Sequence, residues 1–108
     1  MAQLFLKIKD TKIITDNNYA FLAQNSNNYD TIKFEFDEEW DDFSKTVILH
    51  QKENETVKIN LENNICLIPS TVLRYALPLY VSVHGISLNG TDEKDTEHMS
   101  FNVMRGII

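Results

Sequence analysis

The sequence has few of the residues that build disulfide-stapled or phosphate-binding folds. Its single cysteine, Cys66, excludes an internal disulfide, because such a bond joins two cysteines. Its three glycines, Gly85, Gly90 and Gly106, are too few for a glycine-rich phosphate loop or for the glycine-flanked turn of a serine nucleophile. No spacing of cysteine and histidine matches a zinc site. These absences weigh against an enzyme, and we expect no catalytic, cofactor-binding or metal-binding residues.

The chain also lacks a long apolar run and an excess of positive charge. No apolar segment approaches the length that crosses a bilayer, and Met1 to Leu4 does not begin a basic and then apolar leader. Lys and Arg number 10 against 16 Asp and Glu, a net charge of -6 that repels the phosphate backbone of nucleic acids. We therefore expect no membrane and no nucleic acid as partners, and synthesis in the cytoplasm.

What remains is the composition of one folded domain. The 108 residues are 43% hydrophobic and 24% charged, which is close to the average of globular proteins and far from that of disordered chains. A chain of this length buries a sizeable core without disulfides or metals. We expect a single domain over residues 1–108.

Apolar and polar side chains alternate along most of the chain with the period of two that is typical of strands. The first run covers residues 4–9 and ends at a turn near Asp10, and residues 11–15 continue it or pair with it. The clearest run covers residues 31–36, whereas residues 19–23 are apolar but too short to assign. Further strands are expected at residues 45–51, 57–61, 65–68, 79–88 and 101–103.

Two local signals interrupt this alternation. Asn63 and Asn64 tolerate positive φ, so we expect them to join residues 57–61 and 65–68 as a hairpin. Alternation fails at residues 70–76, where the sequence predicts one short helix.

Short strands separated by turn signals define the expected fold class. Residues 89–95 are polar and predict an exposed, mobile connection. About seven or eight strands, each with one apolar face, are typical of an antiparallel β-sandwich or a small barrel. Two packed sheets fit best, and we expect an all-β, immunoglobulin-like sandwich.

Residues 37–42 hold five carboxylates around Trp40, and hard cations such as calcium prefer clustered oxygen ligands. The segment lacks the spacing and the glycine of a calcium loop, so a solvated loop is the favoured interpretation. A glycosidase pair needs carboxylates across a cleft, which neighbours in sequence do not establish. Trp40, the only tryptophan, is expected as a plug at the edge of the core, whereas exposure would indicate a platform for a ligand.

The three histidines, His50, His84 and His98, fall on different expected elements without the paired spacing of a metal site. We expect them on the surface, with His84 in the outward register of its strand. Cys66 lies between two aliphatic residues and has no basic neighbour in sequence, which favours a small buried side chain. A nucleophilic Cys–His pair stays open, since only folding could bring its members together.

Four segments occur in an order that resembles a module of phage and prophage structural proteins. They are FEFDEEWD at residues 34–41, KTVI at 45–48, IPSTVL at 68–73 and LYVSVHG at 79–85. In that module an F-x-F-x-x-x-W-D strand and turn precede a lysine-led strand, an isoleucine-proline turn with a short helix, and a strand ending in glycine. The chain is similar, over about half its length, to the N-terminal domain of baseplate upper proteins from phages of Gram-positive bacteria. It departs from the module at residues 42–43, where a glycine is usual.

The resemblance implies a non-enzymatic virion protein that is made in the bacterial cytoplasm. It implies a tail or baseplate component that packs against copies of itself, as a homo-oligomer, and against other virion proteins. The receptor-binding regions of longer relatives are not implied.

Other functions remain open at this point. One is a sandwich whose end loops bind a carbohydrate or a host protein, which would need Trp40 exposed beside Tyr19 and Tyr29. Another is a small acidic phage-encoded inhibitor that mimics nucleic acid, which needs carboxylates concentrated on one face. An enzyme would need a deep pocket with convergent polar groups.

Overall fold

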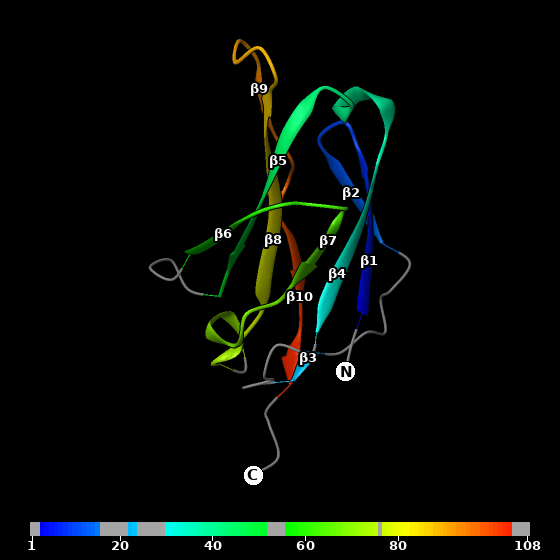
Figure 1. Cartoon of the computed structure of the whole chain (residues 1–108). Helices are drawn as coiled ribbons and strands as arrows, with labels where there is room; N and C mark the ends of the chain where they lie inside the picture. Colours follow the sequence, from blue (N-terminus) through cyan, green and yellow to red (C-terminus); the bar gives the residue numbers. More distant parts are fainter. Residues whose placement is uncertain (1–2, 16–21, 24–29, 52–55, 76, 105–108) are drawn as a thin grey trace.

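Strands form where the alternation of side chains is strongest, as in β1 (Gln3–Lys9) and β4 (Thr31–Phe36). The computed structural model of the chain describes residues 3–15, 22–23, 30–51, 56–75 and 77–104. These residues form eleven strands and two 3-10 helices (Figure 1), more strands than the sequence predicts because several have only two or three residues. The other strands are β2 (Lys12–Thr15), β3 (Leu22–Ala23), β5 (Phe43–His50), β6 (Thr56–Asn60), β7 (Ile65–Leu67), β8 (Leu79–Ser87), β9 (Glu93–Asp95), β10 (Met99–Phe101) and β11 (Val103–Met104).

The strands form two main sheets that pack face to face. One sheet has the order β2-β1-β4-β7, and the other has the order β10-β8-β5-β6, with β9 paired to β8. A short third pair joins β11 and β3. Figure 1 shows β5, β6 and β8 in one layer and β1, β2 and β4 in the other. The expected all-β, sandwich-like class is confirmed.

The core lies between the two main sheets and consists mainly of inward-facing strand residues, together with buried residues of the two 3-10 helices. Burial of each large apolar side chain there stabilises the fold by roughly 1.5–3 kcal/mol. Fully buried members include Leu4, Leu6, Ile32, Phe34, Trp40, Val47, Leu49, Leu79, Val81 and Val83.

The expectation that all strands pair antiparallel is wrong. β1 and β4 are parallel over six residue pairs, from Gln3 opposite Thr31 to Ile8 opposite Phe36. β3 and β11 are parallel as well. A parallel pair needs a long crossover, and the chain between β1 and β4 provides it. The first sheet is therefore mixed, because β1 also pairs antiparallel with β2.

The hairpin expected between residues 57–61 and 65–68 forms only as a turn. Asn63 and Asn64 have the predicted positive φ, 56° and 60°, and the residues that flank them form a single bridge. Beyond that bridge, β6 pairs with β5 in one sheet and β7 pairs with β4 in the other. The prediction of a hairpin is wrong because the five-residue ladder with β5 holds β6 in the opposite layer.

The helix expected at residues 70–76 is a shorter 3-10 helix, η2 (Ser70–Leu73). The buried side chain of Gln51 meets the chain just beyond it. Its Nε2 donates to the carbonyls of Tyr75 and Leu77 at 2.7 and 2.9 Å, and its Oε1 accepts from the Tyr75 N–H at 3.1 Å. These bonds use backbone groups that a further helical turn would need. No helix in the described residues is long and apolar enough to span a bilayer.

The connection expected over residues 89–95 is exposed, but it is a hairpin rather than an irregular loop. β9 pairs antiparallel with the end of β8. Gly90 turns the chain with φ of 76°, and its N–H donates to the Ser87 carbonyl at 2.8 Å. The Ser87 hydroxyl accepts from the Asp92 N–H at 3.0 Å. β9 has three residues, all charged, so the sequence shows no alternation of apolar and polar side chains there.

Candidate functional site

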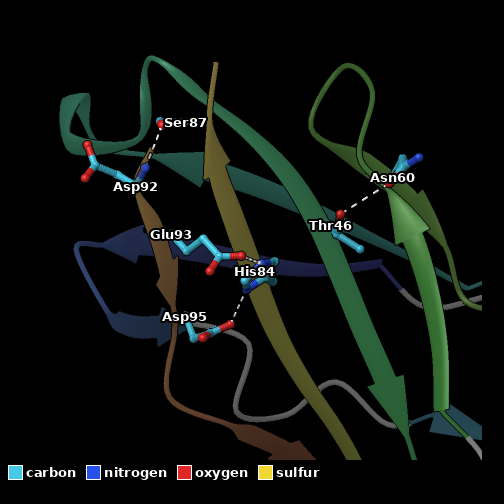
Figure 2. A network of polar contacts seen from close by, with 7 residues as sticks. All are labelled: Thr46, Asn60, His84, Ser87, Asp92, Glu93 and Asp95. Atoms are coloured by element: carbon cyan, nitrogen blue, oxygen red, sulfur yellow. Dashed lines mark hydrogen bonds and ion pairs between the residues drawn. The ribbon is translucent and has the colours of Figure 1, made fainter. Parts of the chain in front are cut away.

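The outer face of the β10-β8-β5-β6 sheet brings together polar side chains that are far apart in sequence. Asn60 lies opposite Thr46, Thr46 opposite His84, and His84 opposite Asp95. Side chains of paired residues project to the same face of a sheet, so the register alone aligns all four in one row. Figure 2 shows this row, in which the Thr46 hydroxyl donates to Asn60 Oδ1 at 3.2 Å.

His84 lies between two carboxylates of β9. Its Nδ1 is 2.6 Å from Oδ1 of Asp95, and its Nε2 is 3.5 Å from Oε1 of Glu93 (Figure 2). A neutral imidazole has one N–H and donates to one of them, whereas an imidazolium donates to both. In a catalytic His–Asp pair the second ring nitrogen faces a nucleophile, but here it faces another carboxylate. The arrangement therefore fastens β9 to β8.

The other two histidines lie on the same face. The His50 ring stacks on Tyr80 with centroids 5.2 Å apart, and the His98 ring meets His50 edge-on at 5.8 Å. As the sequence predicts, the three histidines come from different elements; His98 is exposed, and His50 and His84 are half-buried. Strand pairing gathers all three on one face, and nothing in their spacing along the chain could have shown it.

A hollow of about 410 Å³ lies beside this row. Its lining is mixed, with Ile48 next to Lys58 and the polar residues of the row. Such a lining suits the surface of a partner, which offers apolar and polar groups together. Among the described residues, no group of three or more His, Cys, Asp or Glu side chains is arranged to hold a metal ion.

Trp40 is fully buried, with 0% of its surface exposed, which confirms its predicted role as a plug and contradicts a ligand platform. Its Nε1–H donates to the Asp10 carbonyl at 2.8 Å. Its ring packs between Phe36 and Phe43, with centroids 5.4 and 5.9 Å away. Lys94 also lies over the indole, with Nζ 4.9 Å from the ring centroid, a contact that was not predicted from the sequence. Tyr19 and Tyr29, which the platform hypothesis also needs, lie outside the described residues.

The acidic residues 37–42 fold as the 3-10 helix η1 (Glu38–Trp40) and a turn into β5. Asp37 caps this helix, since its Oδ1 accepts from the Glu39 N–H at 3.2 Å, and its Oδ2 accepts from the Asp10 N–H at 3.1 Å. The other four acidic residues of the segment are exposed, whereas Trp40 is buried. The segment is a solvated turn that seats the indole, as predicted.

Cys66 is buried on the inner face of the four-stranded sheet, as predicted. Burial raises the pKa of its thiol to about 11, against the smaller, lowering effect of a hydrogen bond with the Ile32 backbone. The thiol is therefore protonated and unreactive at neutral pH. The three histidines lie on the outer face of the other sheet, so folding does not create a Cys–His pair.

Both sheets expose apolar side chains on their outer faces. On the four-stranded sheet these are Ile14, Ile65 and Leu67, which are 43, 46 and 56% exposed. On the other sheet they are Tyr80 and Ile86, 36 and 41% exposed. Single exposed apolar residues are ordinary, but several on one face favour contact with another protein.

No known protein family matches the sequence, and no curated protein is significantly similar to it. The resemblance to the phage module rests on the motif residues themselves.

Proposed function

We propose that the chain is a non-enzymatic structural protein of a phage or prophage virion, which assembles a tail or baseplate by packing against copies of itself and other virion proteins. The observation that carries this proposal is the exposed apolar side chains on both outer faces. A two-sided sandwich with exposed apolar side chains on both outer faces can bind a neighbour on each side, as a repeating assembly requires. The immunoglobulin-like type of sandwich is part of the same proposal.

The positions of the motif residues support the resemblance. Three of its four segments meet around Trp40. Phe36 packs on the indole from the first segment, and Lys45 from the second places Nζ 4.9 Å from the Phe36 ring centroid. Gly85, at the end of the fourth segment, lies directly against the indole. Residues that lie apart in a motif but pack against the same side chain depend on one another, so we expect them to be found together in one module.

The test is the assembly state of the protein. We expect light scattering of the purified chain to show an oligomer, and antibodies to detect it in particles made from the surrounding phage or prophage genes. A chain that stays monomeric at high concentration and is also absent from particles would contradict the proposal.

One observation favours the acidic inhibitor as a second candidate. The segment at residues 37–42 adjoins Asp10 at one end of the sandwich, so carboxylates are concentrated there rather than spread evenly. A basic nucleic-acid-binding enzyme of the host would then be the partner, and DNA would compete with the chain for it. Recovery of such an enzyme in place of virion proteins would favour this candidate. The carbohydrate-binding alternative loses its main support, because Trp40 is buried.

A further inference from the structure

The outer face of the four-stranded sheet is basic, although the chain as a whole carries a net charge of -6. We call it the lysine face, and it comprises the outward-facing residues of β1, β2, β4 and β7. Among its described residues the charged side chains are those of Lys7, Lys9, Lys12, Lys33 and Glu35. The excess of lysine makes this face attractive to carboxylates.

Apolar side chains lie between these lysines. Lys33 is opposite Phe5 on one side and Ile65 on the other, with its Nζ 5.8 Å from the Phe5 ring centroid. Lys7 is opposite Ile14. The lysine face therefore combines an apolar centre with cationic groups, which is the composition of a docking surface and not that of a merely solvated one.

The opposite composition occurs at one end of the sandwich. We call this the acidic end, formed by residues 37–42, Asp10 and Leu88. Glu38, Asp41 and Asp42 are exposed and form no ion pair with another described residue. Leu88 is 76% exposed and lies beside Asp42, because its N–H donates to the Asp42 carbonyl at 2.9 Å. A large apolar side chain thus stands next to unpaired carboxylates.

We propose that the lysine face docks the acidic end of a second copy of this chain. Leu88 would lie against Phe5, Ile14 and Ile65, while carboxylates such as that of Asp42 would meet lysines such as Lys33. The two surfaces are opposite in charge and each includes exposed apolar groups, so charge complementarity sets the orientation and apolar burial adds affinity. This inference rests on the proposed function, since it names the contact by which copies of the structural protein pack.

The contact has a consequence for the form of the assembly. The lysine face and the acidic end are different surfaces of one chain, so the contact is heterologous and each copy can use both surfaces at once. A heterologous contact that closes gives a ring, and one that does not close gives a filament. Self-association should therefore proceed beyond the dimer.

The test is a charge swap measured by sedimentation velocity over a range of salt concentrations. We expect self-association of the wild type to weaken as salt rises, because salt screens the rim charges. Lys33→Glu and Asp42→Lys should each weaken it roughly tenfold, since each places like charges opposite one another. The double variant Lys33→Glu/Asp42→Lys restores opposite charges in a single chain and should return association to near the wild-type level.

Arg74→Glu is the matched control, because Arg74 is an exposed cation that follows η2, outside both sheet faces and the acidic end, and receives the same change in charge. It should leave self-association unchanged, and circular dichroism should show the native β spectrum for every variant. A second pair, Lys7→Glu with Asp41→Lys, repeats the swap if one of the first variants does not fold. The inference would be overturned if the double variant associated as weakly as each single variant, or if Arg74→Glu weakened association as much as Lys33→Glu does.

The outcomes separate this inference from the proposed function. An oligomer that the Lys33 and Asp42 changes do not affect overturns the lysine-face contact and leaves the structural role in place. A wild-type monomer found in particles also overturns self-docking, but it supports packing against other virion proteins. A monomer absent from particles overturns both.

Discussion

At the scale of single residues, the packing of Trp40 on Gly85 sets a tight steric constraint. A Cβ atom at Gly85 would lie 2.6 Å from Cζ3 of Trp40 and 3.2 Å from Cδ1 of Phe43. The indole cannot move aside easily, because it is buried and its Nε1–H is bonded to the Asp10 carbonyl. We expect Gly85→Ala to lower the free energy of unfolding by about 1–3 kcal/mol, as overpacking a core does, in urea denaturation.

A double-mutant cycle identifies the indole as the cause. Trp40→Phe shortens the side chain and should itself be destabilising, because it removes the bond to Asp10 and leaves a space. In that background, however, Gly85→Ala should cost less than it does in the wild type, since the added methyl group has room. Equal costs in both backgrounds would show that the indole is not what excludes a side chain at residue 85.

The buried thiol of Cys66 links stability to pH. Burial raises its pKa from 9.0 to about 11 in the folded chain. Below pH 9.0 the thiol is protonated in both the folded and the unfolded state, so its contribution to the free energy of unfolding is fully present there. As the pH rises towards 11, the thiol ionises in the unfolded state before it ionises in the folded state, and this contribution is lost.

We therefore expect the unfolding free energy of the wild type to fall relative to that of Cys66→Ala between pH 9.0 and 11. The relative loss should reach about 2 kcal/mol, from the size of the pKa shift. Urea denaturation at several pH values measures the difference, and Cys66→Ala removes the thiol but keeps every lysine and tyrosine that titrates in this range. Parallel pH profiles would show that the thiol ionises alike in both states.

At the scale of elements, alternation predicts which residues form strands but not which strands pair. β1, β4, β5 and β8 are long and alternate clearly, so the sequence locates them. The parallel pairing of β1 with β4 and the separation of β6 from β7 depend on contacts between residues far apart in the chain. The Asn63-Asn64 turn has the predicted backbone conformation, yet it joins two sheets because each flanking strand has a longer ladder elsewhere.

The same limit applies to the candidate site. The plug role of Trp40 and the burial of Cys66 follow from size, apolarity and neighbours, which the sequence shows directly. The row containing His84 follows from the registers of β5 with β8 and of β8 with β9. The position of Lys94 over the indole depends on β9, whose three charged residues carry no strand signal of their own.

At the scale of the whole molecule, a two-residue segment ties the two sheets together. Thr96 pairs with Val83 of the central strand β8, accepting its N–H on Oγ1 at 2.9 Å and donating to its carbonyl at 3.0 Å. The next residue, Glu97, bonds to the edge of the other sheet. Its N–H donates to the Thr11 carbonyl at 2.8 Å, and its Oε1 accepts from the Ile13 N–H at 3.1 Å. The segment also covers β2, which would otherwise present an unpaired edge.

Substitutions of Glu97 test whether its side chain holds the two sheets together on this side of the sandwich. Glu97→Ala removes the acceptor of the Ile13 N–H, and we expect about 1 kcal/mol less stability and faster hydrogen exchange at that amide. Glu97→Gln keeps an oxygen acceptor at the same place and should preserve most of the protection. Glu62→Ala is the control, because this exposed glutamate lies in the turn on the opposite side of the fold. If alanine and glutamine at residue 97 left the Ile13 amide equally protected, the side-chain bond of Glu97 would not contribute to this closure.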